Sequence, residues 1–203
     1  MATRGGVRVL GVDPGLTRCG VGVVDGPASR PRMVAHACLR TTTDTPLEQR
    51  LLQVHDALVA LVEEHRPDVV AVERVLFGVN VRTAMATGQA AGAALLAAAR
   101  AGVPVVAYSP NDVKLSVTGD GGADKDGVAR MVVAQLGLAE APRPVDVTDA
   151  LAVAITHLAR AGVPGAPTAP FAGPDRPGGR GGGAADWESA IAANPHLRTV
   201  GGT

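Results

Sequence analysis

Four carboxylates stand where apolar segments of the chain begin or end. Asp13 follows a Val-rich run, Glu73 ends a second apolar run, and Asp146 and Asp149 open a helical stretch. Like charges that lie close together raise one another's pKa, so such a cluster is stable at neutral pH mainly when cations occupy it. Oxygen-only ligands favour Mg²⁺ or Mn²⁺. These acids therefore predict metal-assisted phosphodiester chemistry.

Each acid also has an ordinary structural interpretation. Asp13 could form a turn, Glu73 could pair with Arg74, and Asp146 and Asp149 could cap the helix that they open. Asp146 and Asp149 are three residues apart and share one helix face. Ligands gather at the carboxyl ends of strands in an open α/β sheet, so two strand ends and one helix face taken together favour the metal site.

The apolar pattern predicts an α/β domain with a five-stranded mixed sheet flanked by helices. The first three strands are expected to be antiparallel, and the last two, continuous apolar runs, to be parallel. The predicted strands are 7–12, 19–24, 33–39, 68–73 and 103–107. Helices are predicted from Pro46 to Pro67, over 82–101, from Ser109 onward, over 124–136 and over 146–160.

The segment 82–101 is dominated by Ala and contains Gly88 and Gly92. Small residues allow another helix to approach closely. The partner helix could lie within the domain or across a dimer axis.

The composition divides the chain after residue 162. Residues 1–162 are expected to form the folded domain, whereas 163–203 are rich in Pro, Gly and Ala. Such a segment buries too little apolar area to offset its ordering entropy, so we predict a disordered tail with Trp187 in a short, weak helix. The tail could touch a partner or the DNA backbone, or it could be dispensable.

The formal net charge is +0, and the only lysines are Lys114 and Lys125, in one loop-rich region. A neutral chain argues against nucleic-acid binding through a bulk positive field, unless bound cations offset the acids. Cys19 and Cys38 are predicted to be core residues in a reducing compartment, because they form neither a disulfide framework nor a zinc pattern. No apolar run approaches the roughly 18 residues of a membrane span, so we expect a cytoplasmic protein with no membrane partner.

Four segments that follow one another in a fixed order along the chain identify a protein family more specifically than any one of them would. The segments are 11–22, 71–75, 87–92 and 146–157. Together they resemble RuvC, the family of bacterial Holliday junction resolvases, from about residue 7 to residue 160. The resemblance implies a ribonuclease H-like fold, a homodimer, and two Mg²⁺ ions per subunit, with Mn²⁺ as a substitute. It also implies two partners, four-way junction DNA and the RuvA–RuvB branch-migration complex.

The resemblance assigns the metal ligands to Asp13, Glu73, Asp146 and Asp149. It matches the lysines of the family near the DNA to Lys114 and Lys125, one of which would neutralise charge on the scissile phosphate. The implied reaction is two-metal hydrolysis, with one ion activating water and the other stabilising the departing 3′ oxygen. We expect Asp13 to bridge both metals.

The candidate DNA contacts follow the same resemblance. They are Arg18, Arg74, Leu76, Phe77, Asn80, Arg82, Lys114 and Lys125. The family pattern carries Phe three positions after the glutamate, where this chain has Leu76 followed by Phe77. Phe77 could act as the wedge at the junction, Leu76 could suffice, or Phe77 could merely anchor the loop. His157 lies about 12 Å along the helix from Asp149, too far to share the metals, so we expect a structural role.

Two other functions remain open. The pattern Asp-x-Gly-x-Thr after a first strand also describes the phosphate loop of actin-like and sugar-kinase-like ATPases. That fold needs a second domain with an adenosine site, and too little ordered chain remains after Ala107. The other alternative is a non-catalytic nuclease-fold protein that only binds the junction, which the full set of acids disfavours.

Overall fold

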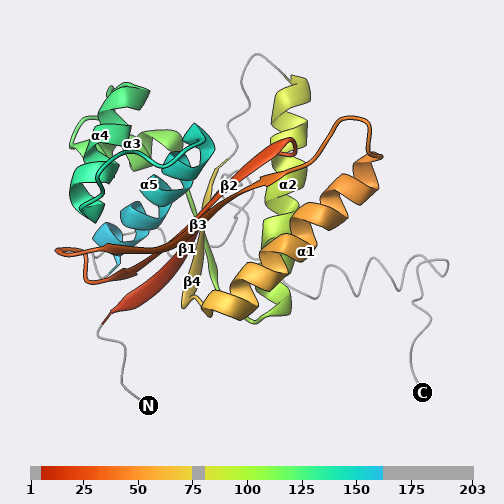
Figure 1. Cartoon of the computed structure of the whole chain (residues 1–203), viewed down its shortest axis with the longest axis horizontal. Helices are drawn as coiled ribbons and strands as arrows, with labels where there is room; N and C mark the ends of the chain where they lie inside the picture. The colour runs from red at the N-terminus through yellow and green to blue at the C-terminus, as the bar shows by residue number, and fades with distance from the viewer. Residues whose placement is uncertain (1–5, 75–80, 162–203) are drawn as a thin grey trace, which may run out of the picture. The chain divides into compact units, whose positions relative to one another are not determined.

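The computed structural model describes residues 6–74 and 81–161, which form a five-stranded mixed sheet between two helical layers (Figure 1). The strand order is β3-β2-β1-β4-β5. The strands are β1 (Val7–Asp13), β2 (Arg18–Gly26), β3 (Arg32–Arg40), β4 (Val69–Glu73) and β5 (Val105–Tyr108). β1, β2 and β3 are antiparallel, whereas β4 is parallel to β1 and β5 is parallel to β4. The predicted mixed sheet is confirmed.

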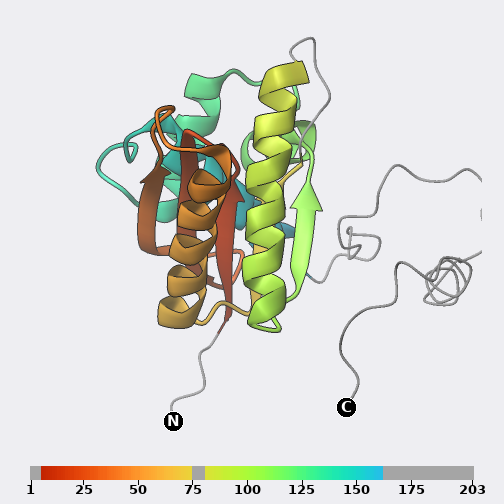
Figure 2. The same cartoon turned by 90° about the vertical axis from the view of Figure 1, so that its right-hand side faces the viewer.

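Five helices cover the two faces of this sheet. They are α1 (Leu47–His65), α2 (Val81–Arg100), α3 (Pro110–Thr118), α4 (Lys125–Leu136) and α5 (Val145–Arg160). α1 and α2 run side by side on one face (Figure 2), and α3, α4 and α5 lie on the other (Figure 1). Alternate residues of the strands therefore belong to two cores. Val9 and Ala71 pack in the cluster with α5, and Val12 and Val72 in the cluster with α1 and α2.

α5 lies directly against β1 and β2 because three strand residues lack a side chain. A Cβ added at Gly11 would collide with the backbone of Ala150, and one at Gly20 with the backbone of Asp146. A Cβ at Gly22 would press on the side chain of Leu151. These glycines permit a buried helix whose first turn reaches the carboxyl end of β1.

β5 begins two residues later than its apolar run predicts. The backbone N–H of Val103 donates to the Ala98 carbonyl and so closes the end of α2. Pro104 has no N–H to offer a sheet. Pairing therefore starts at Val105, which lies opposite Val70 of β4.

Ser109, where the sequence predicts a helix start, is the N-cap of α3. The Ser109 hydroxyl accepts from the Asp112 N–H, and the Asp112 carboxylate accepts from the Ser109 N–H, which completes a capping box. This cap fixes the start of the helix that carries Lys114.

The thiols of Cys19 and Cys38 are free. Cys19 is buried in the core beneath α1 and α2, and Cys38 is partly buried against the core beneath α5. The predicted core role of the cysteines therefore agrees with the structure. Among the described helices, none combines the length and hydropathy needed to cross a membrane. The predicted division at residue 162 and the tail 163–203, including Trp187, lie outside the described residues.

Candidate active site

Asp13 and Glu73 end two neighbouring parallel strands. Val12 of β1 lies opposite Val72 of β4, so the next residues along the two strands are Asp13 and Glu73. Hydrogen-bonded strands lie about 4.8 Å apart, and alternation turns both carboxylates towards the face that α5 covers. Both side chains are partly buried.

α5 brings the other two acids to the same strand ends. The backbone of Asp146 packs on Gly20, and Gly20 lies opposite Asp13 in the sheet. The helix is capped by Pro144 without any side-chain hydrogen bond, so the interpretation of Asp146 and Asp149 as capping residues is wrong. Their carboxylates remain available for chemistry.

Basic side chains surround the acids. The Lys125 Nζ lies 3.7 Å from the Asp149 Oδ2, and the Arg18 Nε lies 3.3 Å from the Asp146 Oδ2. Lys114 and Lys125 line, with Glu73 and Asp149, a cavity of about 110 Å³ whose other walls are apolar. α3 and α4 thus place both lysines of the chain beside the carboxylates.

Burial and mutual repulsion shift the protonation of the acids. Burial, followed by the charges of Glu73, Asp149 and Asp146, raises the pKa of Asp13 to about 8, against the opposing charge of Lys125. Burial and the charge of Asp149 raise the pKa of Glu73 to about 7, although Lys125 and Lys114 lower it. Burial also raises the pKa of Asp149. In the absence of a cation these carboxyls therefore resist ionising together.

A divalent cation fits this donor set. Carboxylate oxygens are the ligands that hard cations prefer, and a cation would offset the burial and the mutual repulsion that raise the pKa values of Asp13 and Glu73. Within 6–74 and 81–161, no three acidic, histidine or cysteine side chains already stand close enough to hold one ion.

Not every predicted site residue can be placed at the acids. Arg74 and Arg82 are exposed, and the backbone N–H of Arg74 donates to the Tyr108 carbonyl. Leu76, Phe77 and Asn80 lie outside the described residues, so the choice of wedge stays a prediction.

His157 contacts Tyr108, the residue opposite Glu73 in the sheet. Its Nδ1 lies 2.9 Å from the hydroxyl of the buried Tyr108, and burial lowers the pKa of the imidazole. This contact agrees with the predicted structural role.

Arg50 is a supporting residue that the sequence interpretation missed. From α1, its Nε donates to the Thr41 hydroxyl at 2.8 Å and its terminal nitrogen donates to the Thr17 hydroxyl at 3.0 Å. The buried Thr41 hydroxyl in turn donates to the Leu16 carbonyl at 2.6 Å. The β1–β2 turn that follows Asp13 is thereby tied to α1. The sequence contains no local signal for a contact across 33 residues.

This arrangement of acids on a mixed sheet has a known counterpart. The family model described as crossover junction endodeoxyribonuclease RuvC matches residues 9–157. The chain belongs to the RuvC family. The predicted resemblance is confirmed.

The RuvC proteins of two bacteria share more than half of the aligned residues with this chain. The crossover junction endodeoxyribonuclease RuvC of Salinispora arenicola is 57% identical over 157 residues, covering 77% of this chain and 90% of that protein. The RuvC of Rhodococcus opacus is 55% identical over 156 residues, covering 76% and 82%. The match thus spans most of each relative.

Comparison with solved structures confirms the ribonuclease H-like fold predicted for this chain. The structure of Thermus thermophilus RuvC in complex with a Holliday junction substrate has a TM-score of 0.72 and 42% sequence identity, covering 74% of this chain and 92% of that one. The yeast mitochondrial Holliday junction resolvase Ydc2 matches with a TM-score of 0.54 at 13% identity and thus shares the fold alone.

Proposed function

We propose that this RuvC-family chain is a structure-specific endodeoxyribonuclease that resolves Holliday junctions by paired symmetric nicks in recombination and DNA repair. The observation that carries the proposal is the meeting of Asp13, Glu73, Asp146 and Asp149 at one end of a RuvC fold. The junction substrate of the Thermus thermophilus relative supports the choice of DNA.

We assign the metal ligands to the same four acids and expect two Mg²⁺ ions per subunit, with Mn²⁺ as a substitute. Bound divalent cations would polarise the scissile phosphate and lower the pKa of the attacking water. We expect Asp13 to serve both ions. In support, the charges of Glu73, Asp149 and Asp146 all contribute, after burial, to its raised pKa.

We expect the two lysines and Arg18 to position the phosphate. Lys125 and Lys114 would hold charge that builds on the phosphate during cleavage, since both line the cavity beside Glu73 and Asp149. Arg18 would contact a neighbouring phosphate without reading sequence. Arg74 and Arg82 remain candidates for such contacts.

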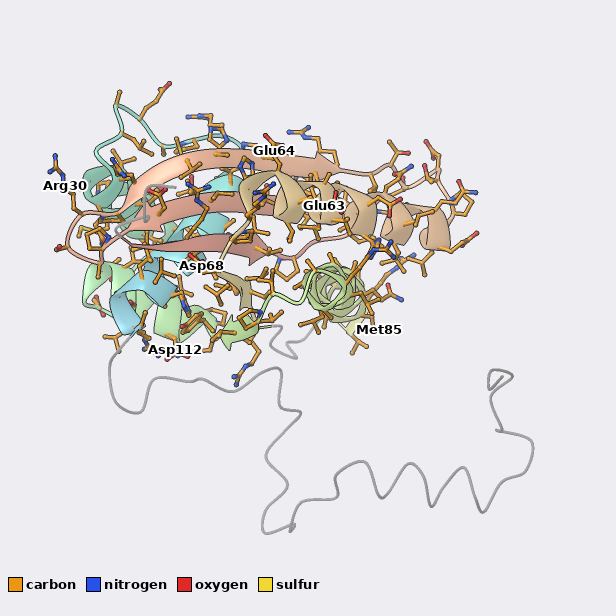
Figure 3. All side chains as sticks on the ribbon, turned by 90° about the horizontal axis from the view of Figure 1, so that it is seen from below. Arg30, Glu63, Glu64, Asp68, Met85 and Asp112 are labelled. Atoms are coloured by element: carbon orange, nitrogen blue, oxygen red, sulfur yellow. The ribbon has the colours of Figure 1, made fainter. Side chains whose placement is uncertain are left out.

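A homodimer would provide two active sites for two nicks on a two-fold junction. The outer face of α2, formed by Val81, Met85, Gly88, Gly92 and Leu96, supports this arrangement. Met85 and Leu96 are 60% and 65% exposed, and Met85 lies on the outer side of α2 (Figure 3). A Cβ at Gly88 or Gly92 would meet nothing within 4 Å, so a second helix has room to approach.

Sedimentation velocity tests the dimer. Met85→Glu should shift the protein towards monomer without lowering its melting temperature, because the side chain touches solvent in one subunit. Glu63→Gln, on exposed α1 surface, serves as the control. A Met85→Glu dimer of unchanged strength would contradict the assignment of this face. The RuvA–RuvB partner stays a prediction that the family resemblance alone supports. The cytoplasmic location also stays a prediction, made from the lack of a membrane-length apolar run and from the cysteines.

Cleavage of a synthetic four-way junction tests the main proposal. With Mg²⁺ the protein should nick opposing strands of the junction and leave linear duplex intact. Asp13→Asn should abolish nicking while junction binding survives. Junction binding without any nicking by the wild type would indicate a scaffold, and ATP binding without junction affinity would indicate an ATPase half-domain.

A further inference from the structure

A groove of about 700 Å³ leads away from the acids on the β2–β3 side of the sheet. It runs from Asp146 and Asp149 along the connection between α4 and α5. Arg18, at the start of β2, lies opposite Arg40, at the end of β3, and both line this groove. Arg143 lines it from the connection before α5.

The basic side chains of the groove differ in how they are used. Arg18 pairs with Asp146 and Lys125 pairs with Asp149. Arg40 and Arg143 are exposed, and neither side chain has a hydrogen bond or ion pair with any residue in the described parts of the chain. Two guanidinium groups thus face solvent beside the acids, and their planar forks suit phosphate oxygens.

The acids of the groove do not cancel this charge at the arginines. Asp146 and Asp149 belong to the candidate metal site, where cations would offset them. Asp126 and Glu140 also line the groove, from the start of α4 and from the connection after it. Once cations occupy the site, positive charge from the four basic residues exceeds the negative charge of these two acids.

We propose that this groove holds the sugar–phosphate backbone of the DNA arm that leaves the active site on the β2–β3 side, with Arg40 and Arg143 as its phosphate contacts. The proposal rests on the proposed function and adds a second substrate surface to it. α2, the proposed dimer helix, packs on β4 and β5, whereas Arg40 belongs to β3 at the other edge of the sheet. The groove therefore leads away from the dimer axis and the centre of the junction.

Contacts with an arm have a different signature from contacts with the crossover. An arm is ordinary duplex, and phosphate contacts carry no sequence information. Loss of Arg40 or Arg143 should therefore weaken binding of a junction and of a linear duplex by the same factor. The preference for the junction should stay unchanged.

The experiment is a salt titration of binding by fluorescence anisotropy in Ca²⁺, a hard cation that the carboxylates can hold, with a labelled four-way junction and a linear duplex of the same sequence. Arg40→Gln and Arg143→Gln should each reduce the slope of log Kd against log salt by about 0.9, the value for one phosphate on duplex DNA. Each should weaken both complexes roughly three- to tenfold at moderate salt. Arg40→Lys and Arg143→Lys should keep the wild-type slope, because they keep the charge.

Arg30→Gln is the matched control. Arg30 is exposed in the turn between β2 and β3, at the opposite end of the hairpin from Arg40 (Figure 3). Arg30→Gln removes the same charge and should leave the salt slopes for the junction and for the duplex unchanged.

Unchanged slopes for Arg40→Gln and Arg143→Gln would overturn the proposal, as would a loss confined to the junction. Wild-type protein that fails to nick a junction in Mg²⁺ would overturn the proposed function instead. If the wild type nicks the junction and the variant slopes are unaltered, only the proposed role of the groove is wrong.

Discussion

The backbone of Gly20 on β2 touches the backbone of Asp146 on α5, so closely that a Cβ on Gly20 would overlap the Asp146 carbonyl oxygen. This contact sets the height of the first turn of α5 above the sheet. Asp13 lies opposite Gly20 in the adjacent strand. One glycine thus fixes the distance between the acid of β1 and the acids of α5.

Gly20→Ala should lower junction cleavage at least tenfold and raise the Mg²⁺ concentration needed for half-maximal rate. The added methyl group must push backbone away, and Asp146 and Asp149 move with it. Gly22→Ala should displace the acids less, because its methyl group would press mainly on the side chain of the buried Leu151 and not on a backbone carbonyl of Asp146. Gly121→Ala, where a Cβ meets nothing within 4 Å, is the control.

Cleavage rates across a Mg²⁺ titration, with circular dichroism at the same temperature, separate displacement from unfolding. Gly20→Ala protein that is folded and has the wild-type Mg²⁺ dependence would contradict this role of the contact.

Arg50→Ala should loosen the turn after Asp13. The change removes two charged hydrogen bonds and leaves the buried Thr41 hydroxyl with one partner fewer, a loss of about 1 to 3 kcal/mol in the free energy of unfolding. We also expect a lower cleavage rate at saturating junction, because Asp13 leads into this turn. Denaturant titration and single-turnover cleavage measure the two effects.

Arg30→Ala, on the exposed β2–β3 turn, should change neither quantity. Full activity of Arg50→Ala with lower stability would limit Arg50 to a structural role, and unchanged stability would contradict the structural role as well.

The acids could be found from sequence because the physical rule is local. A strand that ends in Asp or Glu delivers the carboxylate to the sheet edge, and parallel neighbours such as β1 and β4 deliver theirs together. The seating of α5 also had a signal, since Gly20 and Gly22 share one face of β2. The sequence contains no signal that Arg40 and Arg143 lie in one groove, because only the packing of α5 on the β2–β3 hairpin brings them together. The sequence also could not decide whether Asp146 caps α5, because the backbone geometry makes Pro144 the N-cap residue.

Asp112→Ala should destabilise the protein by about 1 kcal/mol at pH 7, the usual worth of a helix cap. Burial alone would raise the pKa of Asp112, but hydrogen bonds from Ser109 and the charge of Arg160, 3.0 Å away, hold it below its usual value. A lowered pKa means that the contribution is present above the pKa of the unfolded chain, near 4. It is lost as the pH falls through the lower pKa of the folded state.

The difference in unfolding free energy between wild type and Asp112→Ala should therefore shrink in acid. Thermal melts between pH 3 and pH 7 check this, with Asp44→Ala on an exposed loop as the control. A difference that does not depend on pH would show that the ionised carboxylate contributes nothing.

Asp13→Asn should stabilise the metal-free protein while it removes activity. The unfolded chain ionises Asp13 near its ordinary pKa of 3.8, and the folded chain only near a pKa of about 8, because burial and the neighbouring acids oppose the charge. The stability of the metal-free wild type therefore falls as the pH rises from about 4 to about 8, and it falls no further above that. Asn carries no charge and avoids this cost, so its advantage should be absent at pH 4 and largest at pH 8, on the order of 1 to 3 kcal/mol.

Divalent cations should reverse the order, since they stabilise only the folded protein that can bind them. Melting temperatures in EDTA and in Mg²⁺ at both pH values measure the reversal, and Asp44→Asn should follow the wild type throughout. A variant that melts below the wild type in EDTA at pH 8 would mean that the Asp13 charge is already compensated by Lys125 and its neighbours. In that case the acids would need no cation to coexist, and the electrostatic argument for the metal site would fail.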